Sequence, residues 1–118
     1  LLNEAARYLG TPYVWGGYSP SGFDCSGFVS YCLTHSGVRN TGRLTAQGLY
    51  DICTPVSQSE AQPGDLIFFT GTYDAGVPVT HIGIYVGNGQ MIHCGHPVQY
   101  TSINSPYWQS HFYGFGRW

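Results

Sequence analysis

The apolar positions that follow residue 25 recur every three to four residues, which is the spacing of one face of an α-helix. These positions are Phe28, Val29, Cys32 and Leu33. A polar, turn-forming stretch ends at Asp24, and Gly37 supplies a C-terminal stop. The pattern therefore predicts a buried helix that begins at Cys25. A second, N-terminal helix is expected over residues 2–9.

The second half of the chain is typical of β-strands. Residues 62–65 (Gln-Pro-Gly-Asp) have turn chemistry and lead into the apolar run 66–69, which predicts a buried central strand. Residues 79–86 then alternate in polarity, and residues 90–94 follow across Gly87-Asn88-Gly89. This arrangement predicts a β-hairpin.

The hydrophobic pattern also predicts the register of this hairpin. A three-residue turn over 87–89 aligns the apolar residues of the two strands on one face. The expected pairs are Val86 with Gln90, Ile84 with Ile92, and Ile82 with Cys94. The opposite face then carries His81, Gly83, Tyr85, Met91 and His93. A two-residue turn would place the two histidines on opposite faces and break the apolar alignment, so the three-residue turn is favoured.

Composition narrows the possible functions. The 118 residues contain no internal repeat and fit one compact domain. Only 8% of residues are charged, lysine is absent, and the net charge is −2. These values argue against a nucleic-acid binder or a protein that docks on an anionic membrane, and no apolar run is long enough to span a bilayer. Because the chain opens inside a helical pattern without an initiator methionine, we expect a domain cut from a longer protein.

The four cysteines do not have metal-site spacing. They stand at positions 25, 32, 53 and 94 and form no Cys-x-x-Cys pair, so a zinc site is not expected. Cys32 and Cys94 are predicted to be small core hydrophobes. Disulfide pairing among Cys32, Cys53 and Cys94 stays open at this level, because spacing alone does not define connectivity.

Cys25 is the strongest candidate for chemistry. At a helix N-terminus it meets unpaired backbone N–H groups and the positive end of the macrodipole, both of which favour thiolate. We therefore predict a lowered pKa and a nucleophilic role. Asp24 is placed to cap the helix with its carboxylate.

Two histidines complete the requirement for acyl transfer. A lone strand histidine most often makes a structural hydrogen bond to a carbonyl, but His81 and His93 share a predicted face with only Gly83 between them. A thiol, an imidazole base and a polar group that orients the imidazole form a catalytic set. Cys25, His81 and His93 fill these roles.

The remaining histidines are not assigned to the catalytic set. His35 lies near the end of the cysteine helix, where a positive charge is favourable. His96 and His111 lie in loop-like surroundings and receive no role.

Four strings in the sequence are similar to motifs of one family, in the same order and spacing. They are Gly10-Thr-Pro-Tyr-Val-Trp-Gly-Gly17, Gly22-Phe-Asp-Cys-Ser-Gly-Phe28, Pro63-Gly-Asp-Leu66 and His81-Ile-Gly-Ile-Tyr-Val-Gly87. The chain thus resembles the NlpC/p60 family of papain-like cell-wall peptidases over almost its whole length. The resemblance implies an α+β, papain-like fold in which N-terminal helices, including the nucleophile helix, pack on a central antiparallel β-sheet.

The resemblance also implies an activity. Family members hydrolyse stem peptides of bacterial peptidoglycan, typically between γ-linked D-glutamate and the following diamino acid. Cys25 matches the nucleophile, His81 the general base and acid, and His93 the orienting residue. Tyr13 matches an active-site tyrosine that donates to the oxyanion beside the Cys25 N–H, although packing on Trp15 is its structural alternative. No metal or organic cofactor is implied.

The substrate side follows from the same resemblance. Asp24 matches the acidic residue that pairs with the free amine of the stem's L-alanine, and Ser26 is expected to assist. Arg43 matches a family arginine but is left outside the catalytic set. The segments 70–78 and 18–23 are expected to wall the cleft.

The C-terminal tail is similar to peptidase domains of bifunctional, CwlT-like wall hydrolases from Gram-positive mobile elements. We accordingly expect an extracellular or wall-associated protein and a muramidase or wall-binding domain in the same full-length chain. Three alternatives stay open: an N-acetylmuramoyl-L-alanine amidase, an acyltransferase on the same scaffold, and a non-catalytic module that binds wall peptides.

Overall fold

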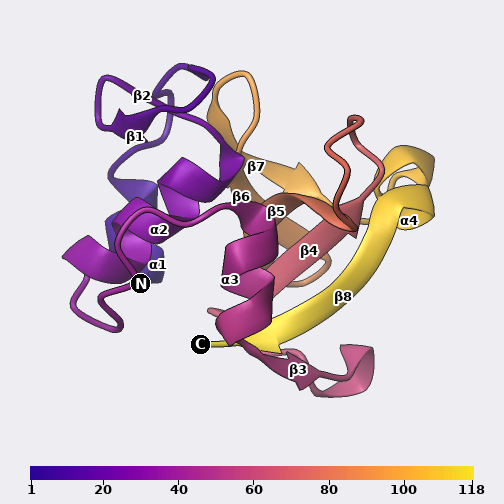
Figure 1. The fold of residues 1–118 in the computed structure, drawn as a ribbon. Helices are drawn as coiled ribbons and strands as arrows, with labels where there is room; N and C mark the ends of the chain where they lie inside the picture. The colour runs from indigo at the N-terminus through magenta and orange to yellow at the C-terminus, as the bar shows by residue number, and fades with distance from the viewer.

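The helices of the N-terminal half pack on an antiparallel sheet built mainly by the C-terminal half (Figure 1). The computed structural model describes residues 1–118. The helices are α1 (Leu2–Ala6), α2 (Cys25–His35), α3 (Ala46–Ile52) and α4 (Pro106–His111), with a 3-10 turn η1 (Gln58–Glu60). A small hairpin of β1 (Tyr18–Ser19) and β2 (Gly22–Phe23) precedes α2. This architecture is the predicted α+β, papain-like fold.

The main sheet has six strands in the order β3-β8-β4-β5-β6-β7, and every neighbouring pair is antiparallel. The strands are β3 (Thr54–Val56), β4 (Leu66–Thr70), β5 (Val79–Gly87), β6 (Gln90–Cys94), β7 (Val98–Ser102) and β8 (Phe112–Arg117). The predicted strand over 66–69 is confirmed as β4, which is buried and central. The C-terminal strand β8 lies between β3 and β4, so the end of the chain forms an inner strand of the sheet.

The nucleophile helix α2 begins where its sequence predicts. The Asp24 side chain accepts a hydrogen bond from the Gly27 backbone N–H at 2.7 Å, which satisfies one of the unpaired donors of the first turn. The helix ends at His35, close to Gly37, whose positive φ of 81° suits glycine. His35 lies in the last turn of α2, as expected.

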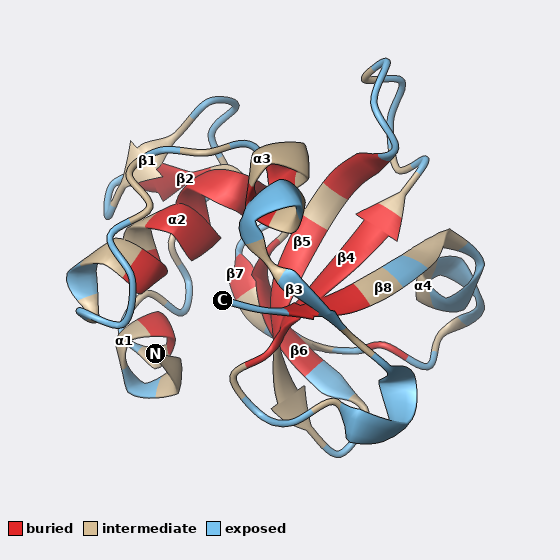
Figure 2. Cartoon of the chain, turned by 60° about the horizontal axis from the view of Figure 1, so that its bottom comes forward, coloured by how far each residue is buried: buried red, intermediate tan, exposed pale blue.

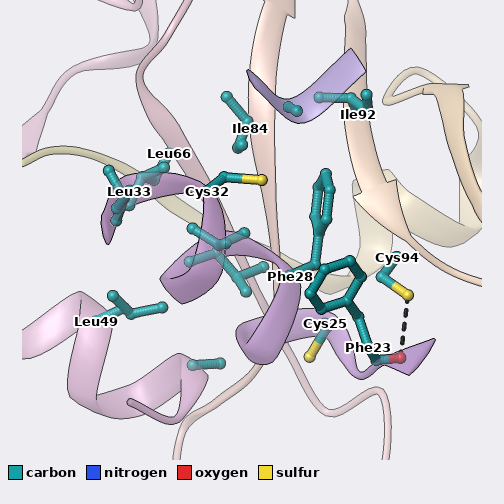
Figure 3. Packing of buried hydrophobic residues seen from close by; sticks show 14 of the residues in the cluster. Phe23, Cys25, Phe28, Cys32, Leu33, Leu49, Leu66, Ile84, Ile92 and Cys94 are labelled. Atoms are coloured by element: carbon teal, nitrogen blue, oxygen red, sulfur yellow. Dashed lines mark hydrogen bonds between the residues drawn. The ribbon is translucent and has the colours of Figure 1, made fainter. Parts of the chain in front are cut away.

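The core lies between α2 and the sheet. Phe28, Cys32 and Leu33 of α2 are fully buried. They pack in one cluster with Ile84, Ile92 and Leu66 of the sheet, and Leu33 lies beside Leu66 (Figure 3). Figure 2 shows buried residues concentrated in α2 and in the central strands. A smaller apolar cluster covers the other face of the sheet and contains Ile67, Phe69, Met91, Ile103 and Phe115. The central strands are therefore buried on both faces.

The hairpin of β5 and β6 has the predicted alignment in its middle and a different turn. Ile84 pairs with Ile92, as predicted, but Gly87 rather than Val86 pairs with Gln90. The register shifts between Tyr85 and Gly87, which is a β-bulge. The three-residue turn was therefore wrong: Asn88 and Gly89, with φ values of 54° and 72°, form the tight turn that an Asn-Gly pair favours. The bulge absorbs the extra residue, so the side chains beyond it keep their predicted faces.

Several elements carry no clear pattern in the sequence and were not predicted: α3, α4 and the strands β3, β7 and β8. The N-terminal helix is also shorter than the predicted range 2–9, since α1 ends at Ala6 and turns follow. All four cysteines are free thiols, and Cys32 and Cys94 are fully buried, as predicted for core residues. None of the helices is long and apolar enough to cross a membrane.

Candidate active site

Cys25 faces strand β5 from the first turn of α2. Its Sγ lies 3.8 Å from the carbonyl oxygen of Thr80, and the backbone N–H of Ile82 also hydrogen-bonds to this sulfur. The two contacts lie on either side of His81 along the strand. Only 8% of Cys25 is exposed. The packing of α2 on β5 therefore brings the predicted nucleophile and the predicted base into one place.

The protonation of Cys25 differs from the sequence-based prediction. Burial, together with the nearby Asp24 carboxylate, raises the pKa of the Cys25 thiol to about 11. The N–H groups of Ser26 and Ile82 favour the thiolate, but they do not offset the loss of solvation. The predicted lowering of the pKa was therefore wrong, because the helix N-terminus that favours charge is buried among apolar side chains. This raised pKa favours the neutral thiol of Cys25 at neutral pH.

The two histidines share a face and touch, as predicted. Nε2 of His81 lies 2.9 Å from Nδ1 of His93, and Nε2 of His93 lies 2.9 Å from Oγ1 of Thr101 on β7. If His93 carries its proton on Nε2 and donates it to Thr101, its Nδ1 is the acceptor for the N–H of His81. Nδ1 of His81 has no partner in the chain and is the nitrogen available for catalysis.

Burial keeps this pair neutral. His93 is only 4% exposed, and desolvation lowers its pKa below the usual value for histidine. Desolvation also lowers the pKa of His81, and the neighbouring His93 lowers it further. Two imidazoles in a dry environment cannot both hold a charge. The pair therefore rests as neutral imidazoles, and His81 is a base ready to accept a proton.

Gly83 makes room for this histidine pair. A Cβ at position 83 would lie 2.8 Å from Sδ of Met91 and 3.2 Å from Cβ of His93. No side chain fits between the strands there without moving one of these neighbours. The absent side chain thus lets His93 approach His81 across the hairpin.

Tyr13 lies beside the nucleophile, as predicted. Its ring packs on His96 with centroids 4.7 Å apart, and both residues line the cleft together with Cys25. Burial raises the pKa of Tyr13 to about 12, so its phenol keeps the proton and is a hydrogen-bond donor. Its structural alternative, packing on Trp15, is not realised, since the ring partner of Trp15 is Tyr73.

Asp24, Ser26 and Arg43 form a polar network next to Cys25. One oxygen of Asp24 caps α2, and the other accepts from Nη2 of Arg43 and from the Gly16 N–H. Nη1 of Arg43 donates to Oγ of Ser26 at 2.9 Å. Arg43, which sequence reasoning left outside the site, is therefore part of it. Arg43 and Asp24 are 19 positions apart in the sequence, and no local pattern near residue 43 indicates this contact.

The cleft has two arms that meet at Cys25. One arm, of about 580 Å³, runs past Asp24 and Arg43 to Asp51; we call it the Asp24 arm. The other, of about 300 Å³, runs past the two histidines to His96; we call it the histidine arm. The residues that line both arms are Tyr13, Cys25, Tyr73 and Thr80.

The walls of the cleft only partly match the expectation. The segment 70–78 does line it, through Thr72, Tyr73, Ala75 and Val77. The segment 18–23 does not, because it closes as the β1–β2 hairpin against α2. The opposite wall is instead the preceding segment with Tyr13 and Trp15. The ring of Trp15 meets that of Tyr73 edge-on, with centroids 5.4 Å apart.

Trp108 is a site residue that the sequence analysis did not single out. It stands on α4, and its ring stacks on His81 with centroids 5.1 Å apart and planes 28° apart. It comes from the C-terminal tail, where no periodic pattern marks it. The structure also holds no group of three or more His, Cys, Asp or Glu side chains arranged to bind a metal ion.

The sequence profile of the NlpC/P60 family matches residues 10–117. The chain belongs to this family. It is 44% identical over 119 residues to the bifunctional muramidase/DL-endopeptidase CwlT of Bacillus subtilis, covering 99% of this chain and 35% of CwlT. It is 48% identical to the probable endopeptidase p60 of Listeria seeligeri, covering 99% of this chain and 21% of p60.

A solved structure of a lipoprotein-like NLP/P60 protein from Staphylococcus aureus superposes on this chain with a TM-score of 0.93 at 44% identity. The match covers 98% of this chain and 39% of the S. aureus chain. The NlpC/P60 domain thus spans about a third of CwlT and a fifth of p60.

Proposed function

We propose that this chain is a cysteine endopeptidase of peptidoglycan stem peptides that cleaves the γ-D-glutamyl–diamino acid bond through a thioester. One observation carries the proposal. Nε2 of His81 is held 2.9 Å from His93, and the backbone on both sides of His81 contacts the Cys25 sulfur. A thiol and an oriented imidazole placed this way form the machinery of nucleophilic acyl transfer.

The first step forms the acyl-enzyme. As Cys25 Sγ attacks the γ-carbonyl carbon, Nδ1 of His81 takes the thiol proton, so no free thiolate accumulates. The resulting oxyanion accepts from the Tyr13 phenol and from the Cys25 N–H, which has no intrahelical acceptor in the first turn. The imidazolium of His81 then protonates the leaving nitrogen, and the C–N bond breaks. His93 keeps the ring of His81 oriented throughout.

The second step releases the product. His81, neutral again, takes a proton from a water molecule that attacks the thioester carbon. The C–S bond breaks, the acid product leaves, and the proton returns to the Cys25 sulfur. Because the proton on His81 must reach the leaving amine, the diamino acid occupies the histidine arm, and the stem's L-Ala-D-Glu part occupies the Asp24 arm.

The Asp24 arm offers a negatively charged carboxylate to a free amine. One oxygen of Asp24 caps α2, and the other accepts hydrogen bonds from Arg43 and from the Gly16 N–H. A substrate ammonium would therefore pair with a carboxylate that is already held in place. Ser26, fixed by Arg43, adds a hydroxyl beside it. This supports recognition of a stem that begins with L-alanine.

The relatives support the reaction class and the place of action. CwlT is a muramidase/DL-endopeptidase and p60 a probable endopeptidase. By this likeness the substrate is peptidoglycan, the protein acts outside the cell or in the wall of a Gram-positive bacterium, and a muramidase or wall-binding domain accompanies it. Such a domain raises the effective concentration of stem peptides at the cleft.

The test is digestion of purified muropeptides that contain either diaminopimelate or lysine, read by product mass. We expect L-Ala-D-Glu and a fragment that begins with the diamino acid. Cys25→Ala abolishes turnover and keeps the fold, whereas Cys53→Ala, outside the cleft, keeps turnover. Cleavage at the lactyl amide, transfer of the acyl group to an added amine, or binding without cleavage would each overturn the proposal in favour of an amidase, an acyltransferase or a binding module.

A further inference from the structure

The ring of Trp108 contacts both imidazoles of the histidine pair. It lies nearly parallel to His81, with centroids 5.1 Å apart and planes 28° apart, and edge-on to His93, with centroids 5.4 Å apart and planes 87° apart. Phe69 of β4 packs on the same indole, with centroids 4.7 Å apart. The indole thus covers Phe69 and the two histidines, which belong to three neighbouring strands of the sheet.

Helix α4 holds Trp108 in this position. Ser105 caps the helix by accepting from the Trp108 backbone N–H, and Gln109 donates through Nε2 to the carbonyl of Ile103 at 2.7 Å. Nδ1 of His111 lies 2.7 Å from the carbonyl oxygen of Thr70, which ties the end of α4 to β4. With its helix anchored at both ends, the indole is a fixed surface rather than a mobile cover.

A fixed aromatic plane restricts what His81 can do. The imidazole can turn about its Cβ–Cγ bond only by leaving the stack, and that turn would also break the hydrogen bond between its Nε2 and His93. The indole face is in addition a favourable neighbour for an imidazolium, because the electron-rich ring attracts a cation within about 6 Å. Both effects act on the state in which His81 holds the proton of Cys25.

We propose that Trp108 is a positioning residue for the catalytic base: it fixes the His81 ring with Nδ1 toward Cys25 and shields the hydrogen bond between the two histidines from water. The inference rests on the proposed function for its kinetic consequence. The placement of the ring does not depend on which bond is cleaved.

The surroundings of His81 allow a pH readout. Its burial depends partly on the indole, and burial lowers its pKa. The titratable groups that line the histidine arm with it are Tyr13, Cys25, Tyr73, His93, Cys94, His96 and Tyr107. None is a carboxylate or a guanidinium, so the pKa of His81 depends mainly on its solvation and on its contact with His93. Desolvation is the largest effect on the pKa of His81 and outweighs the opposing attraction of the indole face for the imidazolium. Removal of the indole, which admits water, should therefore raise this pKa toward the ordinary value.

The experiment compares Trp108→Ala, Trp108→Leu and Trp108→Phe with the parent protein on a stem peptide. We expect the Ala and Leu variants to lose about tenfold or more, mostly in kcat, because a misoriented base fails in the chemical step. The acid limb of kcat/KM moves to higher pH in Trp108→Ala. Trp108→Phe restores most of the rate, because it restores an aromatic face. Tyr113→Ala, an exposed aromatic that packs on Tyr50 outside the cleft, is the matched control.

A second readout does not require activity. In a Cys25→Ala background, NMR titration of His81 gives its pKa with and without the indole, so a failure of the proposed function leaves this test intact. An upward shift in Trp108→Ala supports the positioning role. If the Leu variant keeps the parental kcat and pH profile while only its melting temperature falls, Trp108 is merely structural and the inference is wrong. An unchanged His81 pKa in the Ala variant would also overturn it.

Discussion

Nε2 of His81 lies 2.9 Å from Nδ1 of His93, although the two residues belong to different strands and are joined through a bulged hairpin. His93 is in turn tied to Thr101 on the next strand. The orientation of the catalytic base therefore depends on the register of three neighbouring strands. The side chain at position 93 must present an acceptor to His81 and is itself buried.

Substitutions of His93 should separate its role in orienting His81 from its role in filling space between the strands. His93→Ala leaves the His81 N–H without an acceptor and opens a cavity, so we expect kcat to fall by about 100-fold and stability to fall by about 1–3 kcal/mol. His93→Gln, whose amide oxygen can accept from His81, should retain more activity. Thr101→Val removes only the second hydrogen bond and should cost less than His93→Ala. Steady-state kinetics and thermal melts check this order; equal kcat in the Ala and Gln variants would contradict it.

Gly83 gives a test of the space between the strands. Gly83→Ala places a methyl group 2.8 Å from the buried Met91 sulfur and 3.2 Å from Cβ of His93. We expect a stability loss of about 1–3 kcal/mol from overpacking and a lower kcat from displacement of His93. Gly114→Ala on β8 is the control, because its Cβ meets nothing within 4 Å. Chemical denaturation and kinetics on both variants should show a defect only at position 83.

Much of this site follows from local sequence signals. The apolar face of α2, its Asp24 cap and the alternation of β5 and β6 are each encoded by residues close in sequence. These features place Cys25, His81 and His93 in one site. The bulge at Val86 was missed because a three-residue turn and a tight Asn-Gly turn plus a bulge give the same faces. Composition alone does not distinguish the two.

The rest of the site depends on contacts between distant segments. Arg43 reaches Asp24 from a loop, and Trp108 reaches His81 from the C-terminal tail, so neither contact has a local pattern. The pKa of Cys25 was mispredicted for a related reason. The helix N-terminus is a local feature, whereas burial arises from the packing of the whole sheet on α2, and burial has the larger effect.

Asp24 has two functions that substitution can separate. Asp24→Asn keeps an oxygen for the Gly27 N–H cap but removes the charge that pairs with Arg43, whereas Asp24→Ala removes both. We expect only the Ala variant to lose about 1 kcal/mol from the cap. Both should raise KM by about tenfold for stems with a free L-alanine amine, through loss of a charge-assisted contact. An N-acetylated stem is the control: a similar loss on that substrate would argue against ammonium recognition by Asp24.

The protonation of Cys25 predicts how the free protein reacts with iodoacetamide. Because burial raises the pKa of this thiol to about 11 and keeps His81 neutral, the thiolate fraction near neutral pH is small. The alkylation rate should rise about tenfold per pH unit from pH 7 and level off only near pH 11, since the thiolate is the reactive form. His81→Gln should leave this profile unchanged, because a neutral imidazole does not stabilise the thiolate. A thiolate–imidazolium pair would instead give a fast, flat rate between the two pKa values and lose it in His81→Gln.

The same pKa fixes the sign of a stability effect. The folded pKa of Cys25 lies above its ordinary value of 9.0, so the unfolded chain releases its proton first as pH rises. The stabilising contribution of the neutral thiol is complete below about pH 8 and is lost as pH rises through 9 toward 11. Cys25→Ala should therefore show a smaller drop in melting temperature over this range than the parent. Equal slopes in the two proteins would show that Cys25 is not a protonated, buried thiol.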